Sequence, residues 1–375
     1  MKARVAIITN LIPTYRRGFY DRLLAESDHG ITVYIQKTGT KSNIEVISER
    51  YDNFVNEVSY WSFRGDKLVW HRLPYLKLLM DYDILVVDGN PRHLSQAILS
   101  TVARLIGKKV VIWSTFTSRR NVKLDSLLRQ TWWRLFEYFL MYTEREACDL
   151  VAAGWSAEGV ISVNNGLDQK VIDSVKSEWE FEKITKWKRE HNVNGKRILL
   201  SAGRVLEGRF DFIMDALKDL VAEDSSILWI LVGDGEGMDY LRRAAKSSNL
   251  ESNVIFAGSI YDEEELAPWF LSSDLFIYSE AIGLSLMHAF GYGLPAIIHD
   301  EMATHGPEAS IFTDQQTGLS YEKGNLDDFK TKVRILLNNE NERKAMGHEA
   351  LSRVKTKYNA EIMAKQFSKL IKKLS

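Results

Sequence analysis

Short runs of Val, Ile and Leu alternate along the chain with segments in which apolar residues recur every three or four positions. Near-continuous apolar runs separated by amphipathic helices indicate parallel strands that are covered on both faces. In the first half this pattern predicts strands at Arg4–Thr9, Ile31–Gln36, Asp83–Asp88, Lys109–Ser114 and Gly159–Val163. It predicts helices near Arg17–Ser27, Trp70–Met80, His93–Ile106, Leu124–Phe139 and Glu144–Ala153. We expect the polar residues 37–66 to form a long excursion over the surface.

A second alternation of the same kind begins at Arg197. Its strands are expected at Arg197–Ala202, Ser226–Val232, Asn253–Ala257, Leu275–Tyr278 and Pro295–His299. Its helices are expected near Phe212–Val221, Gly237–Ser247, Asp262–Leu271, Leu284–Tyr292 and Leu326–Leu337. Two further helical patterns, Asn341–Lys355 and Ala360–Leu374, close the chain.

The length of 375 residues exceeds the roughly 250–300 residues that one hydrophobic core usually organises. The two alternations therefore predict an α/β protein with two doubly wound, Rossmann-like parallel sheets facing each other across a cleft. We expect an N-terminal domain at 1–165, a linker at 166–195, a C-terminal domain at 196–355 and a last helix at 356–375. The C-terminal helices should pack back toward the first domain. Sheets of this kind bind ligands at the carboxyl ends of their strands.

Composition and charge narrow the class of protein further. With 45% hydrophobic and 26% charged residues, the chain is globular rather than disordered. A single cysteine, Cys148, excludes an internal disulfide and a zinc site built from thiolates. Residues 1–165 hold 22 basic and 17 acidic residues and the remainder 27 and 33, so a uniformly basic nucleic-acid binder is not indicated. Apolar stretches fall far below the ~20 residues that span a bilayer, and we expect a cytoplasmic protein.

Glycine followed by a polar residue occurs after several strands of the second series. Gly203 and Arg204 follow the first of these strands, and Arg209 comes five residues later. Two guanidinium groups at a strand-to-helix turn suit a diphosphate, although a pair of solvated arginines is the alternative. Gly258 and Ser259 follow another strand. The Gly-Asp-Gly segment around Asp234 lacks the G-x-G-x-x-G spacing and is weak evidence for a dinucleotide site.

The segment from Glu280 to Pro295 carries the most information. Glu280 ends a strand, Gly283 permits a tight turn, and Leu284 and Ser285 open an amphipathic helix whose first amides can bind an anion. His288 lies one turn into that helix. Taken alone, His288 is more often a core or capping residue than a functional one, whereas Glu280 is the better candidate.

These motifs, in this order, resemble those of the retaining GT-B glycosyltransferases of family 4, which use nucleotide-sugar donors. The family carries Gly-Arg-x(4)-Lys and later Glu-x(7)-Glu. The matching positions are Gly203, Arg204, Glu280, Gly283, Leu284, Ala289, Gly293 and Pro295. The resemblance also covers the N-terminal Asn10–Arg16 and the Asn165–Asp168 segments, and therefore nearly the full length. The chain departs from the family where Arg209 stands at the lysine, without the glycine that should follow, and where His288 stands at the second glutamate. The first-domain histidine of many members is also absent, and Trp113–Thr115 stands about where it would be.

The resemblance implies a role for each of these residues. Arg204 and Arg209 would neutralise the diphosphate, assisted by amides from Gly283 to Ser285, and Glu280 would accept hydrogen bonds from the donor sugar. His288 would lie near the ribose or phosphate. The remaining donor-side residues would be Gly203, Asp234, Gly258, Ser259 and Ile260. No metal or other cofactor is expected, since the arginines and the helix dipole take the place of a cation.

The first domain would receive the acceptor. Asn10, Tyr15 and Arg16 follow its first strand, and Asn90 follows another strand on the same edge. An ordinary turn is the alternative for these positions. The segment Arg119–Phe139 combines basic residues with Trp132 and Trp133, which suits an anionic membrane surface. A core helix with a basic outer face is the alternative interpretation.

The leading hypothesis is a retaining glycosyltransferase that moves a sugar from a UDP- or GDP-sugar to a glycan or a lipid-linked glycan. Such an enzyme would be cytoplasmic, with peripheral attachment to the inner face of the membrane as an option, and with no nucleic-acid partner. A nucleotide-sugar 2-epimerase on the same fold is one alternative. A catalytically degenerate binding subunit is another, suggested by His288 and by the altered segment around Arg209.

Overall fold

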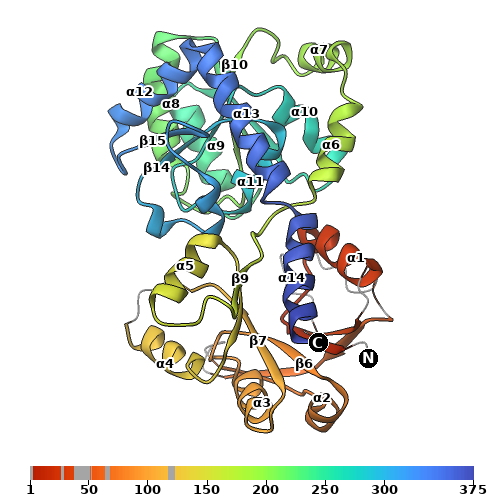
Figure 1. Ribbon diagram of the computed structural model, residues 1–375. Helices are drawn as coiled ribbons and strands as arrows, with labels where there is room; N and C mark the ends of the chain where they lie inside the picture. Colours follow the sequence, from red (N-terminus) through yellow and green to blue (C-terminus); the bar gives the residue numbers. More distant parts are fainter. Residues whose placement is uncertain (1–2, 27–28, 38–50, 52, 64–67, 117–122) are drawn as a thin grey trace. The chain divides into compact units, whose positions relative to one another are not determined.

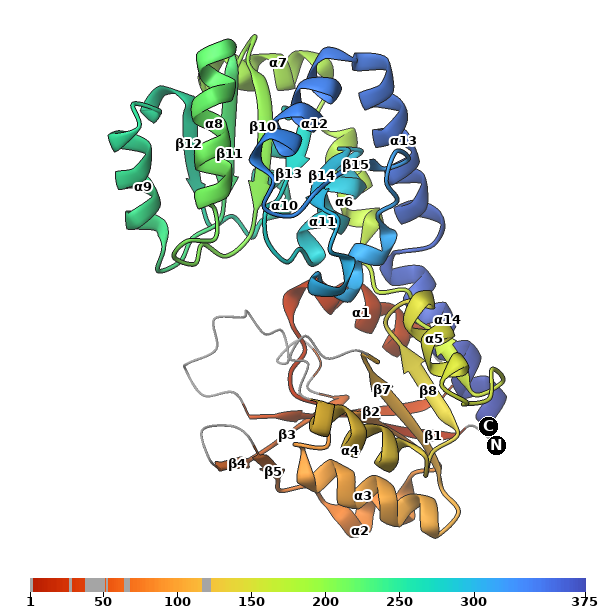
Figure 2. The same ribbon diagram turned by 90° about the vertical axis from the view of Figure 1, so that its left-hand side faces the viewer.

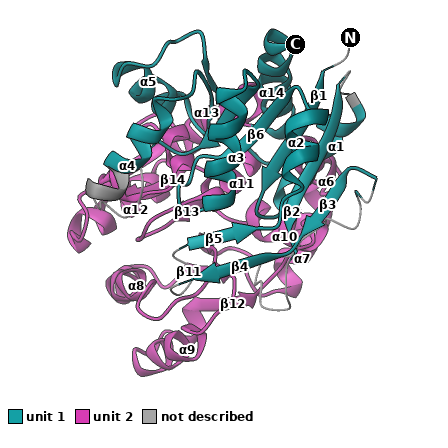
Figure 3. Ribbon diagram, turned by 90° about the horizontal axis from the view of Figure 1, so that it is seen from below, with its two compact units in different colours: residues 1–168, 359–375 teal, residues 169–358 magenta. Residues whose placement is uncertain are grey.

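The computed structural model describes residues 3–26, 29–37, 51, 53–63, 68–116 and 123–375. The chain forms two compact units, one of residues 1–168 and 359–375 and the other of residues 169–358. Figure 3 shows these two units in separate colours. Each unit is built on a parallel sheet, so the predicted α/β class with two parallel-sheet domains is confirmed.

A seven-stranded parallel sheet forms the centre of unit 1 (Figure 1). Its strand order is β3-β2-β1-β6-β7-β8-β9. The strands are β1 (Arg4–Thr9), β2 (Gly30–Gln36), β3 (Val55–Val58), β6 (Ile84–Asp88), β7 (Lys109–Ser114), β8 (Tyr138–Met141) and β9 (Val160–Ser162). A separate antiparallel pair is formed by β4 (Tyr60–Phe63) and β5 (Leu68–His71). The sheet grows outward in one direction from β1 and in the other from β6.

Helices cover both faces of the unit 1 sheet. Alternate residues of β1 point to opposite faces, because Val5 and Ile7 belong to one buried cluster and Ala6 and Ile8 to another. The first face is covered by α1 (Arg17–Glu26) and α14 (Ala360–Leu374). The second is covered by α2 (Tyr75–Asp81), α3 (Leu94–Leu105), α4 (Lys123–Trp133) and α5 (Glu144–Ala152). For α14, the prediction that the end of the chain packs back onto the first domain is confirmed.

Unit 2 contains a six-stranded parallel sheet in the order β12-β11-β10-β13-β14-β15 (Figure 2). Its strands are β10 (Arg197–Ala202), β11 (Ile227–Val232), β12 (Val254–Gly258), β13 (Leu275–Ile277), β14 (Ala296–His299) and β15 (Gly318–Tyr321). Its helices are α6 (Gln169–Ser177), α7 (Phe181–Glu190), α8 (Asp211–Glu223), α9 (Met238–Ser247), α10 (Glu263–Leu271), α11 (Leu284–Tyr292), α12 (Leu326–Asn338) and α13 (Glu340–Thr356). Helices α6 and α7 occupy much of the stretch expected as a linker.

Several elements differ from the sequence-based expectation. Residues 138–141 form strand β8, whereas the pattern predicted a helix as far as Phe139. A run of a few apolar residues is too short to distinguish a strand from a helix by its periodicity. Because these residues follow a helical pattern directly, the pattern assigned them to that helix. The predicted helix from Trp70 is in fact strand β5 followed by α2, with Pro74 preceding the first turn of that helix. Strands β3, β4 and β15 were not predicted, and each has only four residues.

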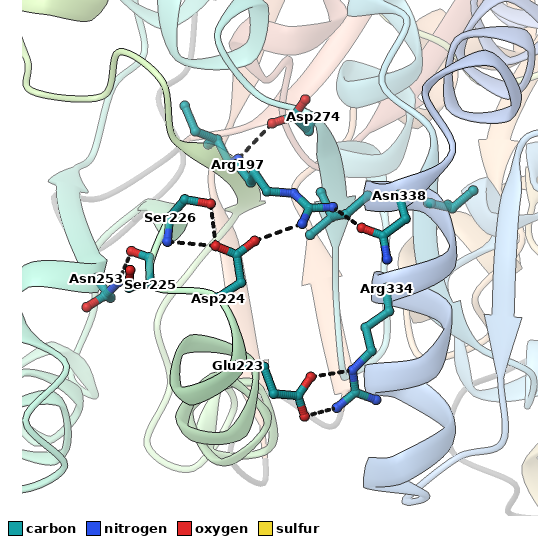
Figure 4. A network of polar contacts seen from close by, with 12 residues as sticks. Arg197, Glu223, Asp224, Ser225, Ser226, Asn253, Asp274, Arg334 and Asn338 are labelled. Atoms are coloured by element: carbon teal, nitrogen blue, oxygen red, sulfur yellow. Dashed lines mark hydrogen bonds and ion pairs between the residues drawn. The ribbon is translucent and has the colours of Figure 1, made fainter.

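A polar network ties together the amino ends of the strands in unit 2 (Figure 4). Arg197, the first residue of β10, donates to Asp224 at 2.7 Å and to Asn338 at 2.7 Å. Arg334 of α12 makes a two-pronged ion pair with Glu223 at the end of α8, at 2.7 and 2.6 Å. These contacts fix α8 and α12 to the edge of the sheet opposite the carboxyl ends of the strands.

Candidate functional site

The carboxyl ends of β10 and β13 define the candidate site in unit 2. These strands pair in parallel, and the sheet grows away from them in opposite directions. Ligands of open α/β sheets bind outside such a reversal of strand order. Gly203 and Arg204 directly follow β10, and Ser279 and Glu280 follow β13 at the same edge. The structure therefore brings together the two motifs that the sequence analysis singled out.

Glycines allow the loops at this edge to approach each other closely. Gly203 has a φ of +149° and Gly233 a φ of +148°, a region that other residues rarely adopt. A Cβ on Gly233 would lie 1.9 Å from the carbonyl oxygen of Gly203, and one on Gly235 would lie 2.2 Å from that of Val205. The amide of Gly233 also donates to the carbonyl of Gly258 at 2.7 Å. The Gly-Asp-Gly segment thus serves loop packing in this structure.

The two arginines of the predicted phosphate motif are held differently. Arg204 is exposed, and its guanidinium group pairs with Glu236 at 3.1 Å. Arg209 is half-buried, and its Nη1 lies 3.3 Å from the carbonyl oxygen of Arg204 and 3.5 Å from the hydroxyl of Tyr278. The pairing between Arg204 and Glu236 is weak because both groups are solvated. An anionic ligand could therefore take the place of Glu236 at little cost.

Glu280 lies exposed in the loop that follows β13, beside the buried Tyr278 and Tyr321. Burial raises the pKa of Tyr278; Arg209 opposes this rise and Glu280 adds to it. Burial likewise raises the pKa of Tyr321, and Glu280 again adds to the rise. The hydroxyl of Ser279 donates to the carbonyl of Arg209 at 3.1 Å. Glu280 and Arg209 therefore share one polar neighbourhood in which both phenols stay neutral.

His288 is held by a carboxylate from a neighbouring helix. Its Nε2 lies 2.9 Å from Oε1 of Glu263, the first residue of α10, and Tyr292 donates to the same oxygen. The ring of Phe270 stacks on both His288 and Tyr292, with centroids 5.0 Å apart in each pair. Burial raises the pKa of Glu263, but the hydrogen bonds from His288 and Tyr292 outweigh it and the pKa lies below its usual range. Glu263 is thus an ionised partner for His288.

The other donor-side candidates surround this edge. Asp234 is exposed, and its Oδ1 accepts the amide of Gly235 at 2.7 Å, which forms a tight turn. Gly258 ends β12 with a φ of +76° and is followed by the exposed Ser259 and half-buried Ile260. Gly283 precedes α11 and has no side chain to cap it, so the first amides of that helix, at Leu284 and Ser285, point out of its amino end.

The acceptor-side candidates lie in unit 1 at the carboxyl ends of β1 and β6. Asn10 follows β1, and its side-chain oxygen is buried without a hydrogen bond among the described residues. Tyr15 is exposed, whereas Arg16 is buried, with its Nη1 2.8 Å from the sulfur of Met363. Asn90 follows β6 and its side chain accepts the amide of Arg92 at 3.1 Å. Arg16 and Asn90 therefore already have structural contacts.

The tryptophans of the predicted membrane segment are fully or partly buried in unit 1. Trp133 is fully buried, and its indole donates to the carbonyl of Gly89 at 3.0 Å. Trp132 is half-buried and donates to the hydroxyl of Thr101 at 3.1 Å. Arg119 and Arg120 lie outside the described residues. The expectation that these tryptophans form an interfacial surface is therefore wrong, because both rings pack into unit 1.

Three side chains at this edge of unit 2 were missed by sequence reasoning: Glu236, Glu263 and Tyr278. Glu236 and Tyr278 stand within three residues of predicted site residues, and that proximity was the available signal. Glu263 is the first of three acidic residues in the first turn of α10, a pattern that is common at the start of helices. The sequence around Glu263 therefore does not predict its contact with His288. The contact of His305 with the Glu280–Gly283 turn spans 23 residues, and only tertiary structure reveals it.

Solved structures with a similar fold were found over the full length of the chain. The chain has a TM-score of 0.72 to the Anabaena protein HepE, solved in complex with UDP, at 13% identity over 100% of both chains. It has a TM-score of 0.73 to a glycosyltransferase from Rickettsia africae, at 13% identity over 100% of this chain and 98% of the other. These likenesses establish the GT-B fold, with its two parallel-sheet α/β units.

Sequence comparison finds a family match within unit 2. Residues 183–353, all within unit 2, match the family model of glycosyl transferases group 1. The chain is 29% identical to the alpha-monoglucosyldiacylglycerol synthase of Streptococcus pneumoniae over 34% of its own length and 29% of that protein. It is 30% identical to protein CapJ of Staphylococcus aureus over 36% and 34% of the two chains. The chain thus spans about a third of these curated relatives. The family match is therefore confined to unit 2, whereas the likeness in fold covers the whole chain.

None of the described helices is long and apolar enough to cross a membrane.

Proposed function

We propose that the protein is a retaining glycosyltransferase of family 4 that transfers a sugar from a UDP- or GDP-sugar to a glycan or lipid-linked glycan. The observation that carries this proposal is the placement of Arg204, Arg209 and Glu280 at one edge of the unit 2 sheet, inside the region that matches the family model. The products are the glycosylated acceptor and a free nucleoside diphosphate. Cleavage of the donor places negative charge on that diphosphate.

Arg204 and Arg209 stabilise this developing charge. Arg209 is anchored by the carbonyl of Arg204 and the hydroxyl of Tyr278, so its guanidinium group is preorganised. Arg204 leaves Glu236 and turns to the phosphates when the donor binds. Preorganised donors aimed at developing charge usually contribute more to catalysis than any other effect, and one good donor lowers the barrier by about 2.7–4 kcal/mol. Amides at Gly283 to Ser285 assist from the start of α11.

The rest of the donor contacts the neighbouring loops. Glu280 accepts hydrogen bonds from the sugar hydroxyls and fixes the orientation of the sugar. The pair of His288 and Glu263 lies nearer the nucleotide, and its ionised carboxylate is a suitable acceptor for ribose hydroxyls. Gly203, Asp234, Gly258, Ser259 and Ile260 complete the donor side. The reaction proceeds without a metal ion, so turnover should survive an excess of EDTA.

The acceptor is bound by unit 1 and is a glycan or a glycolipid. Asn10, Tyr15, Arg16 and Asn90 mark the edge where β1 and β6 end. Names of the relatives support this class of acceptor: one is a monoglucosyldiacylglycerol synthase, and another is a poly(ribitol-phosphate) alpha-N-acetylglucosaminyltransferase of Staphylococcus aureus.

We also propose that the protein attaches peripherally to the inner face of the membrane, but through a different surface from the tryptophans. Many large apolar side chains are exposed on α2, α3 and α4 or within two residues of the ends of α3 and α4, and these helices lie on one face of the unit 1 sheet (Figures 1 and 2). They form the α2–α4 face: Leu76, Met80, Ile98, Val102, Leu105, Ile106, Leu127, Leu128 and Leu135. Basic residues such as Lys77 and Arg134 are exposed beside it. Apolar and basic groups together suit an anionic membrane surface.

A screen of nucleotide sugars tests the proposed activity. Thermal stability is measured with each candidate donor, beginning with UDP-glucose because HepE has been solved with that compound. A true donor at 100 times its dissociation constant should stabilise the protein by about 2.7 kcal/mol. Release of nucleoside diphosphate is then followed with and without acceptor. Acceptor-dependent release supports transfer, whereas an epimerase releases no diphosphate in steady state and a binding subunit shows no turnover on any donor.

A further inference from the structure

The segment that follows β14 fastens the turn that carries Glu280. In this segment His305 precedes Gly306, and the short helix η5 (Pro307–Ile311) comes next. The amide of Ile282 donates to Nδ1 of His305 at 3.1 Å, and the amide of Gly306 donates to the carbonyl of Ile282 at 2.7 Å. Both polar backbone atoms of Ile282 are thus bonded to one neighbouring segment. Ile282 itself is completely buried.

The hydrogen bonds of His305 fix its protonation and its tautomer. Ile282 offers an N–H group, so Nδ1 must carry no proton in order to accept it. Nε2 lies 2.9 Å from the carbonyl oxygen of His299, so this nitrogen must carry the proton. The ring is buried and stacks on that of His299, with centroids 3.9 Å apart. His305 therefore serves as a neutral bridge between β14 and the Glu280–Gly283 turn.

We propose that His305 is a positioning residue that holds Glu280 and the start of α11 in their working geometry through the amide of Ile282. The inference rests on the proposed function, because it concerns the same donor edge. Glu280 precedes Ile282 by two residues and Gly283 follows it directly. A Cβ on Gly283 would lie 3.8 Å from Oε2 of Glu308, so η5 also lies against this turn. Fixing Ile282 therefore fixes both the carboxylate and the amides that face the donor.

Protonation of His305 would release the turn. A proton on Nδ1 would face the N–H of Ile282, and a buried hydrogen bond would become a repulsive contact. The groups that act on the neighbouring His299 include Tyr321 of β15, Asp300, Glu301 and Lys323, and Glu308 lies against Gly283 of the turn. Burial first, and then His305, lowers the pKa of His299 to about 4, so His299 is neutral near pH 7. The bridge as observed therefore requires the neutral ring of His305.

Amide hydrogen exchange at Ile282 tests the hydrogen bond to His305 without any substrate. We compare the wild type with His305→Leu, which loses both hydrogen bonds, and with His305→Asn, whose side-chain oxygen can replace Nδ1 as an acceptor. The exposed His348 of α13 provides the matched control, His348→Asn. The peptide that contains Ile282 should exchange at least about tenfold faster in His305→Leu than in the wild type, His305→Asn or the control. Equal protection in His305→Leu and the wild type would overturn the proposal.

Kinetics test whether the bridge matters for turnover. We expect His305→Leu to lower kcat by about 10- to 100-fold with little change in the KM of the donor, and His305→Asn to recover most of it. If both variants fold and lose kcat equally, the positioning role is wrong. A wild type that turns over no nucleotide sugar would contradict the proposed function, and exchange at Ile282 would still decide the role of His305.

Discussion

At the scale of single residues, the candidate site is defined by how each charged group is anchored. Arg209 is fixed by neighbours that belong to the fold, whereas Arg204 is exposed and pairs with Glu236. Glu280 has an open position beside two neutral tyrosines, and His288 is tied to Glu263. Substitutions at these four positions should therefore fail in different ways.

Removing either arginine should weaken the binding of the nucleoside diphosphate and slow the reaction. We expect Arg204→Ala and Arg209→Ala each to reduce turnover by about 10²–10³, since each loses a donor to the developing charge. Calorimetry with the free diphosphate and steady-state kinetics measure the two effects. Arg334→Ala is a suitable control, because Arg334 belongs to the network at the opposite edge of the sheet. Unchanged affinity and rate in both variants would falsify the assignment of this edge.

Glu280 and His288 should separate turnover from binding. Glu280→Gln keeps the shape but loses the ionised acceptor, so turnover should fall much more than diphosphate affinity. His288→Ala should weaken diphosphate binding as well. His288→Glu restores the family residue but places a second carboxylate against Glu263, so it should bind poorly unless Glu263→Gln is added. Calorimetry on these variants decides the roles, which are wrong if Glu280→Gln abolishes diphosphate binding while His288→Ala leaves it intact.

At the scale of helices, strands and loops, the sequence predicts where the site lies better than how it is built. An apolar run followed by Gly203 located the carboxyl end of β10, and an apolar run followed by Ser279 and Glu280 located that of β13, because strand burial and loop polarity are both visible in residue type. The contacts of Glu263 with His288 and of His305 with Ile282 join residues 25 and 23 positions apart. Such pairs depend on how the loops meet, and no local pattern specifies them. Short elements such as β8 and β15 were missed for the opposite reason, since four residues carry too little periodicity.

The network at the amino edge of the unit 2 sheet predicts a pH-dependent contribution to stability. Hydrogen bonds from Ser226 and Arg197 hold the pKa of Asp224 below its usual range. A carboxylate with a lowered pKa stabilises the folded state above its unfolded pKa, and this contribution is lost as the pH falls through the folded value. Asp224→Asn should therefore cost about 1 kcal/mol of unfolding free energy above about pH 5, and less below about pH 4.

Denaturant unfolding of the wild type and Asp224→Asn between pH 3 and 7 measures this difference. Asp239→Asn, an exposed change on α9, serves as the control and should alter stability little at any pH. A difference between the wild type and Asp224→Asn that is independent of pH would show that the charge of Asp224 contributes nothing.

At the scale of the whole molecule, the two units differ in net charge, unit 1 being basic and unit 2 acidic. Unit 1 holds 26 Lys and Arg against 19 Asp and Glu, and unit 2 holds 23 against 31. The α2–α4 face belongs to the basic unit. If the protein meets an anionic bilayer, unit 1 is the part whose charge favours contact.

Vesicle co-sedimentation tests the proposed membrane contact. Binding should require anionic lipid, weaken with salt, and drop several-fold in Leu105→Glu/Leu127→Glu, which places two carboxylates on the α2–α4 face. Ile335→Glu, an exposed apolar position on α12, is the matched control. Equal binding of the double variant and the wild type would exclude this face, and equal binding to neutral vesicles would exclude the electrostatic part.

The return of α14 to unit 1 has a consequence for how the chain folds during synthesis. Phe367, Leu370 and Ile371 complete the core of unit 1, yet the ribosome makes them only after all of unit 2. Unit 2 can therefore reach its native state while one face of the unit 1 sheet is covered by α1 alone, so the core of unit 1 is completed after that of unit 2. A fragment of residues 169–358 should fold alone with a cooperative thermal transition, whereas residues 1–168 should remain aggregation-prone until a peptide of residues 359–375 is supplied.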